Sequence, residues 1–237
     1  MAPLDDVAEE LPATAAAGID SVLSSLRERL ADAQSQEWGL RALELLSDND
    51  GNQERILAAG GVEVVIRAMC EHLNSDAVQL AGCGVLSAIA IGSVNPLKIA
   101  EAGGIEAVLK ALRAHGRNPH LQESCCALLQ ALSESEDSKR TIAANGGVEL
   151  VLGAMRQHPE HADLQESACQ ALWSLGGPNL HEAASCLDSI EAVLTAMRRF
   201  SGSETLQESG LRALGSLVAD LESNPETAAS CAQAAIT

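Results

Sequence analysis

KRTIAANGGVELVLGAMRQHPEHADLQESACQALWSLG, residues 139–176, contains three segments with helical periodicity. The first segment ends at Gly146-Gly147, and glycine ends helices because it adopts the left-handed C′ conformation without a Cβ penalty. The second, 148–158, has apolar residues at helical spacing. After Pro159 interrupts the chain, residues 164–175 form a third and longer segment that is apolar on one side. The stretch therefore predicts a unit of three helices.

The same pattern recurs along the chain at intervals of 42 or 43 residues. The letters LQES begin at Leu121, Leu164 and Leu206. The glycine pair has counterparts at Gly60-Gly61 and Gly103-Gly104. Such a period is typical of helical solenoids, whose repeats bury their apolar faces only by stacking. We therefore expect one continuous domain over residues 1–237.

Residues 139–176 resemble an armadillo repeat, and the similarity covers nearly the whole chain. The resemblance implies an all-α fold, a right-handed armadillo-type α-solenoid of about five three-helix repeats plus a partial sixth. A two-helix HEAT repeat fits less well, because the glycine pair separates the first helix from the second. The repeats fall at 4–48, 49–92, 93–135, 136–177 and 178–221, with the partial repeat at 222–237.

The ends of the chain depart from this pattern. Pro12 interrupts the first helix of the first repeat, and Asp188-Ser189 replaces the glycine pair of the fifth, where we expect a turn that closes without glycine. The partial sixth repeat is either a natural cap or the beginning of a longer array.

Composition and charge exclude several classes of protein. The chain is 46% hydrophobic but has no Tyr, one Phe and two Trp, which predicts an aliphatic core between helices and no strands. No apolar run is long enough to span a bilayer, and the acidic start lacks the features of a signal peptide. We therefore expect a cytoplasmic protein, with the nucleus as the alternative. The net charge of −18 argues against nucleic-acid binding.

Three other residue types recur with the repeat. Cys83, Cys126 and Cys169 alternate with leucine at equivalent positions, which indicates core packing and neither a metal site nor a disulfide. A histidine and an arginine recur near the end of the second helix, where a cation interacts favourably with helical carbonyls. These residues are His72, His115 and His158, and Arg27, Arg113, Arg156 and Arg198. A basic strip that binds an acidic partner is the alternative. We expect no metal and no cofactor.

In armadillo proteins the third helices line the concave surface, so the resemblance implies that their polar sides face a groove. Peptide-binding members such as importin alpha carry a Trp and, four residues later, an Asn on each third helix. The Trp positions here hold Arg41, Gly84, Ala127, Gln170 and Arg212, and the Asn positions hold Leu45, Ala88, Ala131, Ser174 and Ser216. Recognition of the importin type is therefore not expected, and Trp173 lies outside the Trp register.

Acidic and amide residues do recur on the third helices. One equivalent position holds Glu37, Glu123, Glu166 and Glu208. Glu37 and Glu208 each have an arginine four residues later, a spacing that favours an ion pair, whereas Glu123 and Glu166 do not. We therefore expect unneutralised carboxylates in the middle of the groove, with a solvated surface as the alternative. A repeated glutamine is expected to join adjacent loops or helices by hydrogen bonds. It occurs at Gln36, Gln79, Gln122, Gln165 and Gln207.

The sequence contains no phosphate loop, dinucleotide-binding glycine pattern or serine nucleophile elbow, so we do not expect an enzyme. It predicts a scaffold or adaptor that binds a basic, extended segment of a partner protein along its concave surface. The predicted partner-binding residues are Glu123, Glu166, Gln170, Trp173, Ser174, Gln130, Glu37, Arg41, Glu208 and Arg212. One alternative is a structural subunit held in a larger assembly through its end faces and convex side. Another is a metabolite-sensing regulatory domain of a larger protein.

Overall fold

The computed structural model describes residues 18–91, 95–176 and 186–223. Within these ranges the regular elements are α-helices and no strand occurs, which confirms the predicted all-α class. None of the described helices has both the length and the apolar character that crossing a bilayer requires. The interruption predicted at Pro12, and the partial sixth repeat from residue 224 onward, lie outside the described residues.

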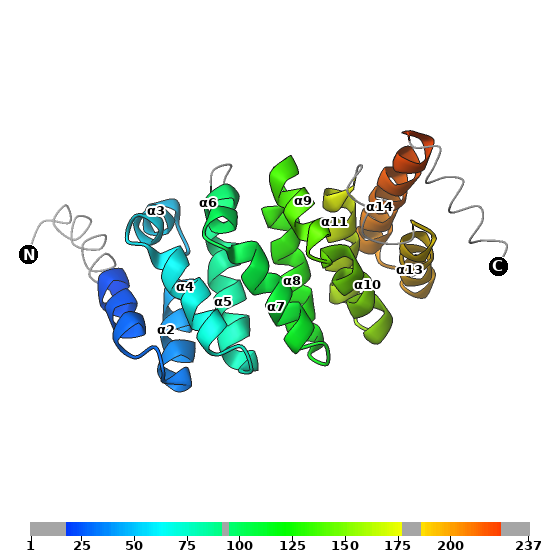
Figure 1. The fold of residues 1–237 in the computed structure, drawn as a ribbon. Helices are drawn as coiled ribbons and strands as arrows, with labels where there is room; N and C mark the ends of the chain where they lie inside the picture. The colour runs from blue at the N-terminus through cyan, green and yellow to red at the C-terminus, as the bar shows by residue number, and fades with distance from the viewer. Residues whose placement is uncertain (1–17, 92–94, 177–185, 224–237) are drawn as a thin grey trace, which may run out of the picture. The chain divides into compact units, whose positions relative to one another are not determined.

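The chain forms two compact units, Met1–Ala107 and Val108–Thr237. The single domain predicted for residues 1–237 stays a prediction. In the N-terminal unit α2 and α4 both pack against α5 (Figure 1). Its helices are 18–28, α2 (Ala33–Leu46), α3 (Asp50–Ala58), α4 (Gly61–Glu71), α5 (Asp76–Ile89) and α6 (Asn95–Glu101). Helix α7 (Gly104–Ala114) spans the boundary between the units.

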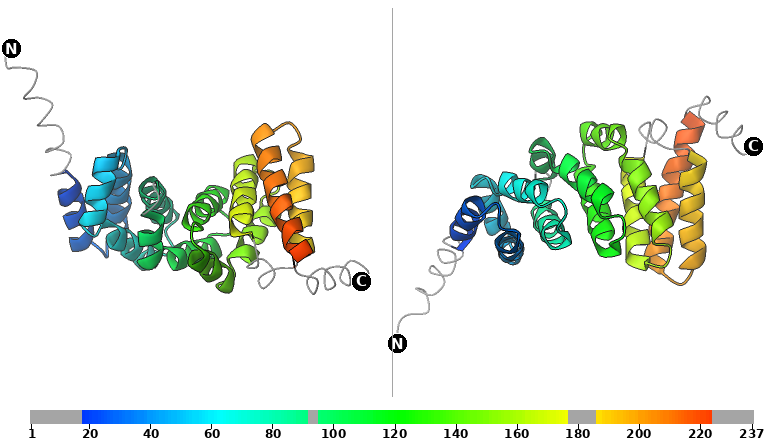
Figure 2. Two further views of the ribbon diagram at one scale, coloured as in Figure 1. Left: turned by 90° about the horizontal axis from the view of Figure 1, so that it is seen from above. Right: turned by 60° about the horizontal axis from the view of Figure 1, so that its bottom comes forward.

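In the C-terminal unit α11 packs against both α8 and α14, and α10 and α13 pack against α11 and α14 respectively (Figures 1 and 2). The helices are α8 (Pro119–Leu132), α9 (Glu136–Ala144), α10 (Gly147–Gln157), α11 (Ala162–Leu175), α13 (Cys186–Arg199) and α14 (Glu204–Ser223). The apolar side of α11 is in the core, where Leu164, Leu172 and Leu175 have no exposed surface. The three helices expected for residues 139–176 are thus present.

The glycine pairs form the predicted turns, and the two glycines have different functions. Gly60, Gly103 and Gly146 have φ of 69°, 91° and 74°, which is the left-handed region that penalises a Cβ. The second glycine permits close packing: a Cβ on Gly147 would lie 2.4 Å from Ile142 Cγ2 and 2.8 Å from the Ile142 carbonyl oxygen. The left-handed turn was predicted from the sequence, but the close approach was not.

The repeated glutamine connects the second and third helices of each repeat, as predicted. In the C-terminal unit Gln165 Nε2 donates to the carbonyl oxygens of Met155 at 2.9 Å and His158 at 3.0 Å. Gln36, Gln79, Gln122 and Gln207 make the same two bonds, to residues ten and seven positions earlier. Because the carbonyls at the end of a helix lack intrahelical partners, the amide satisfies groups that would otherwise be buried unpaired.

The histidines and arginines connect neighbouring repeats. His158 Nε2 lies 2.6 Å from the carbonyl oxygen of Gly116, 42 residues earlier, and His72 bonds to Leu30 at the same distance and separation. Arg27 Nη2 donates to the carbonyl of Ala59 at 2.6 Å, at the end of α3. Arg113 makes the same bond to the end of α9. An arginine thus does bind carbonyls at a helix end, but the sequence-based expectation named the wrong helix: the carbonyls belong to the first helix of the next repeat.

Three details in the C-terminal unit differ from the sequence-based expectation. No turn occurs at Asp188-Ser189, because α13 begins at Cys186 and continues through both residues; only glycine permits the left-handed turn at low cost. Arg156 donates to the Asp188 carboxylate at 3.0 Å, so a side chain replaces the carbonyl acceptor found in other repeats. Helix α14 continues to Ser223, two residues beyond the predicted end of the fifth repeat at 221.

Candidate functional site

The acidic positions lie on the third helices, α8, α11 and α14 in the C-terminal unit. We call the polar sides of these three helices the third-helix face. Glu123 on α8, Glu166 on α11 and Glu208 on α14 occupy equivalent positions on it, and α11 packs between its two neighbours. Glu37 and Arg41 are the equivalent residues on α2, in the N-terminal unit.

The two predicted ion pairs are present. Arg41 Nη2 lies 2.9 Å from Glu37 Oε1, and Arg212 Nη2 lies 2.6 Å from Glu208 Oε1. Each pair spans one helical turn and is exposed to solvent, so it adds only about 0.3–0.5 kcal/mol to stability. The main consequence of the two pairs is therefore that the charges of Glu37 and Glu208 are neutralised.

Glu166 has no cationic partner in the described part of the chain, but its carboxylate is hydrogen-bonded. Thr205 Oγ1 on α14 donates to Glu166 Oε2 at 2.6 Å, and Gln170 Nε2 donates to Oε1 at 3.2 Å. Gln170 also reaches Ser209 on α14 at 3.4 Å. Glu166 is therefore part of the contact between α11 and α14, which the sequence pattern did not predict.

Trp173 lies next to an arginine of the same chain. The Arg212 guanidinium is 5.0 Å from the ring centroid of Trp173, which is a cation–π contact between α11 and α14. The indole remains 41% exposed, so part of it is available to a ligand. The other two predicted residues, Ser174 on α11 and Gln130 on α8, are half-buried. The sequence-based prediction placed Trp173 among the partner-binding residues and did not identify its contact with Arg212.

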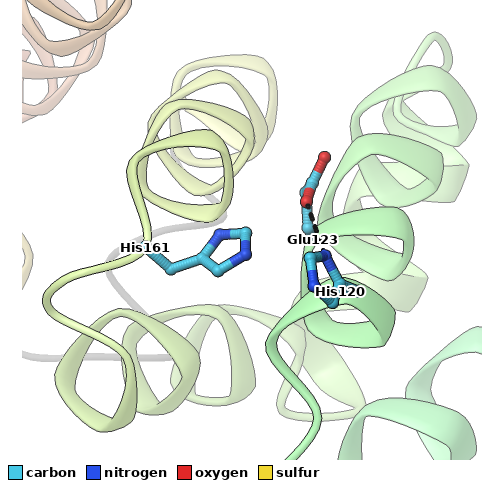
Figure 3. Close-up of side chains that lie close together, drawn as sticks. All are labelled: His120, Glu123 and His161. Carbon is cyan, nitrogen blue, oxygen red and sulfur yellow. Dashed lines mark ion pairs between the residues drawn. The ribbon is translucent and has the colours of Figure 1, made fainter.

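Glu123 has a different environment from that of Glu166. His120 Nδ1 lies 4.0 Å from Glu123 Oε2, and the ring of His161 faces both side chains from the beginning of α11 (Figure 3). In the described part of the chain no Lys or Arg pairs with Glu123. In the described residues neither glutamate pairs with an arginine, and the two differ in that Glu166 accepts hydrogen bonds from Thr205 and Gln170.

Buried thiols lie on the third helices, namely on α5 in the N-terminal unit and on α8 and α11 in the C-terminal unit. Cys83, Cys126 and Cys169 have no exposed surface, which confirms that they are core residues. Burial, with a smaller contribution from the nearby Glu123 carboxylate, raises the pKa of Cys126 to about 12. Burial and Glu166 raise the pKa of Cys169 to about 12 as well. Both thiols are therefore protonated at neutral pH, which makes them poor nucleophiles and poor metal ligands.

A pocket of about 380 Å³ lies between α10 and α13 in the C-terminal unit. Two arginines line it, and both already have acidic partners: Arg156 pairs with Asp188, and Arg199 pairs with Glu160. The pocket therefore offers little uncompensated charge to an anionic metabolite.

No protein-family model matches the chain, and no curated protein matches it. Among solved structures it is similar to an engineered protein whose crystal structure was determined as a target of the Northeast Structural Genomics Consortium. The two chains share 19% sequence identity with a TM-score of 0.60, over 85% of this chain and 97% of the engineered protein. At this identity the likeness concerns the fold alone.

Proposed function

We propose that this protein is an armadillo-type α-solenoid that acts as a non-enzymatic scaffold in the cytoplasm or nucleus. The 43-residue period, the left-handed glycine turns and the repeated glutamine bonds support the solenoid. The free thiols of Cys70, Cys126 and Cys169 support a reducing compartment. The buried, protonated thiols of Cys126 and Cys169 are poor nucleophiles, which fits a binding role.

The ligand is a basic, extended segment of a partner protein that lies along the third-helix face. One observation carries this proposal: Glu123 and Glu166 are at equivalent positions on adjacent helices, and neither has an ion pair with Lys or Arg in the described residues. An incoming Lys or Arg would supply the missing charge. Trp173 adds apolar surface beside them, and the net charge of −18 would attract a cationic segment over distance.

The spacing of the helices limits the ligand. Packed helices lie roughly 10 Å apart, and an extended chain advances at most about 3.5 Å per residue. Basic residues three apart would therefore meet successive glutamates. Peptides with lysines three residues apart should bind more tightly than peptides of identical composition in which the lysines are adjacent.

Fluorescence anisotropy with labelled peptides of these two kinds tests the proposal. The double change Glu123→Lys plus Glu166→Lys should abolish binding of the spaced peptide, whereas Glu37→Lys, in the N-terminal unit, should leave it nearly unchanged. Binding should weaken as salt rises, because exposed charges are screened within about 8–10 Å at physiological ionic strength. Equal affinity of the double variant and the unmodified protein would show that these carboxylates are only solvated.

A structural subunit of a larger assembly is the second candidate, and exposed apolar side chains favour it. Trp38 and Leu45 on α2 are 64% and 78% exposed, and Leu211 on α14 is 62% exposed. Large apolar groups on the surface often mark protein interfaces. Replacing Trp38 and Leu45 with glutamine should leave peptide binding intact, but should release the protein from such an assembly in a pull-down from its native source.

A further inference from the structure

Two histidines and one glutamate meet where α8 and α11 begin. His120 comes from the first turn of α8, Glu123 comes from one turn later, and His161 is the residue before α11 (Figure 3). One possible ligand atom from each residue lies within 4.8 Å of the corresponding atoms of the other two. The imidazole rings of His120 and His161 are 5.0 Å apart between centroids and meet edge to face.

The local fold explains why these side chains converge. Pro119 begins α8, so His120 is in its first turn, and Glu123 lies one turn later on the same side of the helix. His161 is the N-cap of α11, and its Nδ1 accepts a hydrogen bond from the backbone N–H of Leu164 at 3.2 Å. Because α11 packs against α8, the cap of one helix faces the first turn of the other.

This arrangement is close to that of a catalytic or transport zinc site. Zinc binds imidazole nitrogen and carboxylate oxygen at about 2.1 Å, so neighbouring ligands in a tetrahedral site are about 3.4 Å apart. The separations between the three atoms are at most 4.8 Å, so each pair must approach by no more than about 1.4 Å, which side-chain rotation can supply. His120 is able to rotate in this way, because its side chain is 74% exposed and not held by packing.

The donor set selects the kind of ion. Imidazole nitrogen disfavours Mg²⁺ and Ca²⁺, which prefer oxygen ligands, and favours zinc and related transition metals. Three protein ligands leave one tetrahedral position open. We propose that His120, Glu123 and His161 form a divalent transition-metal site, with zinc preferred and the fourth position open to water or to a side chain of a partner.

Two features of the site set a limit on its affinity. Both helix N-termini direct partial positive charge towards the ion, which opposes binding. In addition, His161 uses its Nδ1 lone pair to cap α11, so binding through Nε2 would move the ring proton to Nδ1 and remove that hydrogen bond. The Glu123 carboxylate and the negative charge of the chain act in the opposite direction. We therefore expect a micromolar and not a nanomolar dissociation constant for zinc.

The metal site does not depend on the proposed peptide-binding function. A bound dication would reverse the charge around Glu123, so zinc should weaken binding of a basic peptide and favour an acidic or histidine-containing one. His161→Asn separates the two proposals, because it removes a metal ligand and leaves both carboxylates of the third-helix face in place.

Isothermal titration of the metal-stripped full chain with zinc chloride tests the site. The titration buffer would contain an excess of magnesium chloride, so that weak carboxylate sites on this acidic protein are already occupied. We expect one zinc ion per chain with micromolar affinity. Cobalt(II) should bind at the same stoichiometry and show the strong visible absorption of a tetrahedral complex. Affinity should fall as the pH is lowered, because protons compete with the metal for imidazole.

The variants are His120→Ala, Glu123→Gln and His161→Asn, and each should weaken zinc binding at least tenfold. Asparagine is the matched replacement at 161, because Asn118 occupies the equivalent position and caps α8 with its side chain. Glu208→Gln, on α14, is the control that should bind zinc as the unmodified chain does. Far-UV circular dichroism would verify that all four variants keep their helices.

The results are decisive in either direction. Loss of binding in the three site variants, with binding retained in Glu208→Gln, would establish the site. If the unmodified chain fails to bind zinc stoichiometrically, the inference is wrong. It is also wrong if all three site variants bind zinc with unchanged affinity, since the ion would then be held elsewhere on the acidic surface.

Discussion

Helices α8 and α11 contain the same four residues, LQES, in the same position, and two of the four have the same environment in both. Leu121 and Leu164 have no exposed surface. Gln122 and Gln165 each donate to two carbonyls at the end of the preceding helix, at distances between 2.9 and 3.2 Å. The buried half of the motif is therefore structurally equivalent in the two repeats.

The other two residues of the motif, glutamate and serine, are half-buried in both helices, and the glutamates differ in their neighbours. Glu166 accepts hydrogen bonds from Thr205 and Gln170, whereas Glu123 lies beside two histidines. Both helices carry glutamate at this position, so the difference arises from the neighbouring side chains and not from the repeated residue itself. A repeated core residue meets the same backbone in each repeat, but a repeated surface residue meets side chains that vary from one repeat to the next.

The largest expected effect tests whether the buried glutamine has the same role in α8 and in α11. Gln122→Leu and Gln165→Leu should each lower the free energy of unfolding by about 2–3 kcal/mol, because each leaves two carbonyls near the core without a donor. Urea denaturation of both variants measures this. The comparison would fail if one substitution were tolerated within about 0.5 kcal/mol and the other were not.

The next largest expected effect tests the difference between Glu166 and Glu123. Glu166→Lys should destabilise the protein by about 1–2 kcal/mol, because it removes the acceptor of Thr205 and Gln170. Glu123→Lys should change the free energy of unfolding by less than about 0.5 kcal/mol, as surface substitutions usually do. The same urea titration distinguishes them. Equal destabilisation would mean that the two glutamates have equivalent structural roles after all.

The buried cysteines should again behave alike. Cys126→Ala and Cys169→Ala should each cost about 1 kcal/mol, since each removes one buried sulfur atom from the core. In the unmodified chain both thiols should resist a disulfide reagent at pH 8, while the exposed Cys70 reacts. Rapid reaction of more than one thiol among the described cysteines, with the fold intact, would contradict the burial of these side chains.

The raised thiol pKa values also predict how stability depends on pH. Folding raises the pKa of Cys126 and Cys169 from 9.0 to about 12, so the native state keeps protons that the unfolded chain releases. The contribution of these two thiols to the free energy of unfolding is complete below pH 9 and is lost as the pH rises towards 12. Urea unfolding at several pH values should show the decline, and the double Cys→Ala variant should show a smaller one.

The smallest effect concerns Trp173. Gln130 holds the equivalent position on α8, so Trp173→Gln gives α11 the residue of α8. The change should cost about 0.5 kcal/mol, because it removes an exposed cation–π contact with Arg212. Indole fluorescence would report the contact directly: Arg212→Ala should shift the emission of Trp173 in a Trp38→Phe background. An unshifted spectrum would show that the arginine does not hold the indole in solution.

The helices, the glycine turns and the hydrogen-bonding role of the repeated glutamines could be predicted from the sequence alone. These features depend on interactions that recur with the repeat: periodic burial, the φ > 0 requirement at Gly60, Gly103 and Gly146, and a polar residue at a fixed place beside helix ends. Comparison of equivalent positions along the sequence was sufficient to predict these three features. The same comparison located Glu123 and Glu166 and identified which glutamates have an arginine four residues later.

The side chains that meet between repeats could be identified only from the folded structure. His120 and His161 are not equivalent positions, since His120 corresponds to Asp163 and His161 to Asn118, so alignment of the repeats does not bring them together. They meet because the cap of α11 packs beside the first turn of α8. The hydrogen bond from Thr205 to Glu166 and the contact of Arg212 with Trp173 likewise join different helices. Such contacts depend on the rotation and spacing of packed helices, which a linear period does not specify.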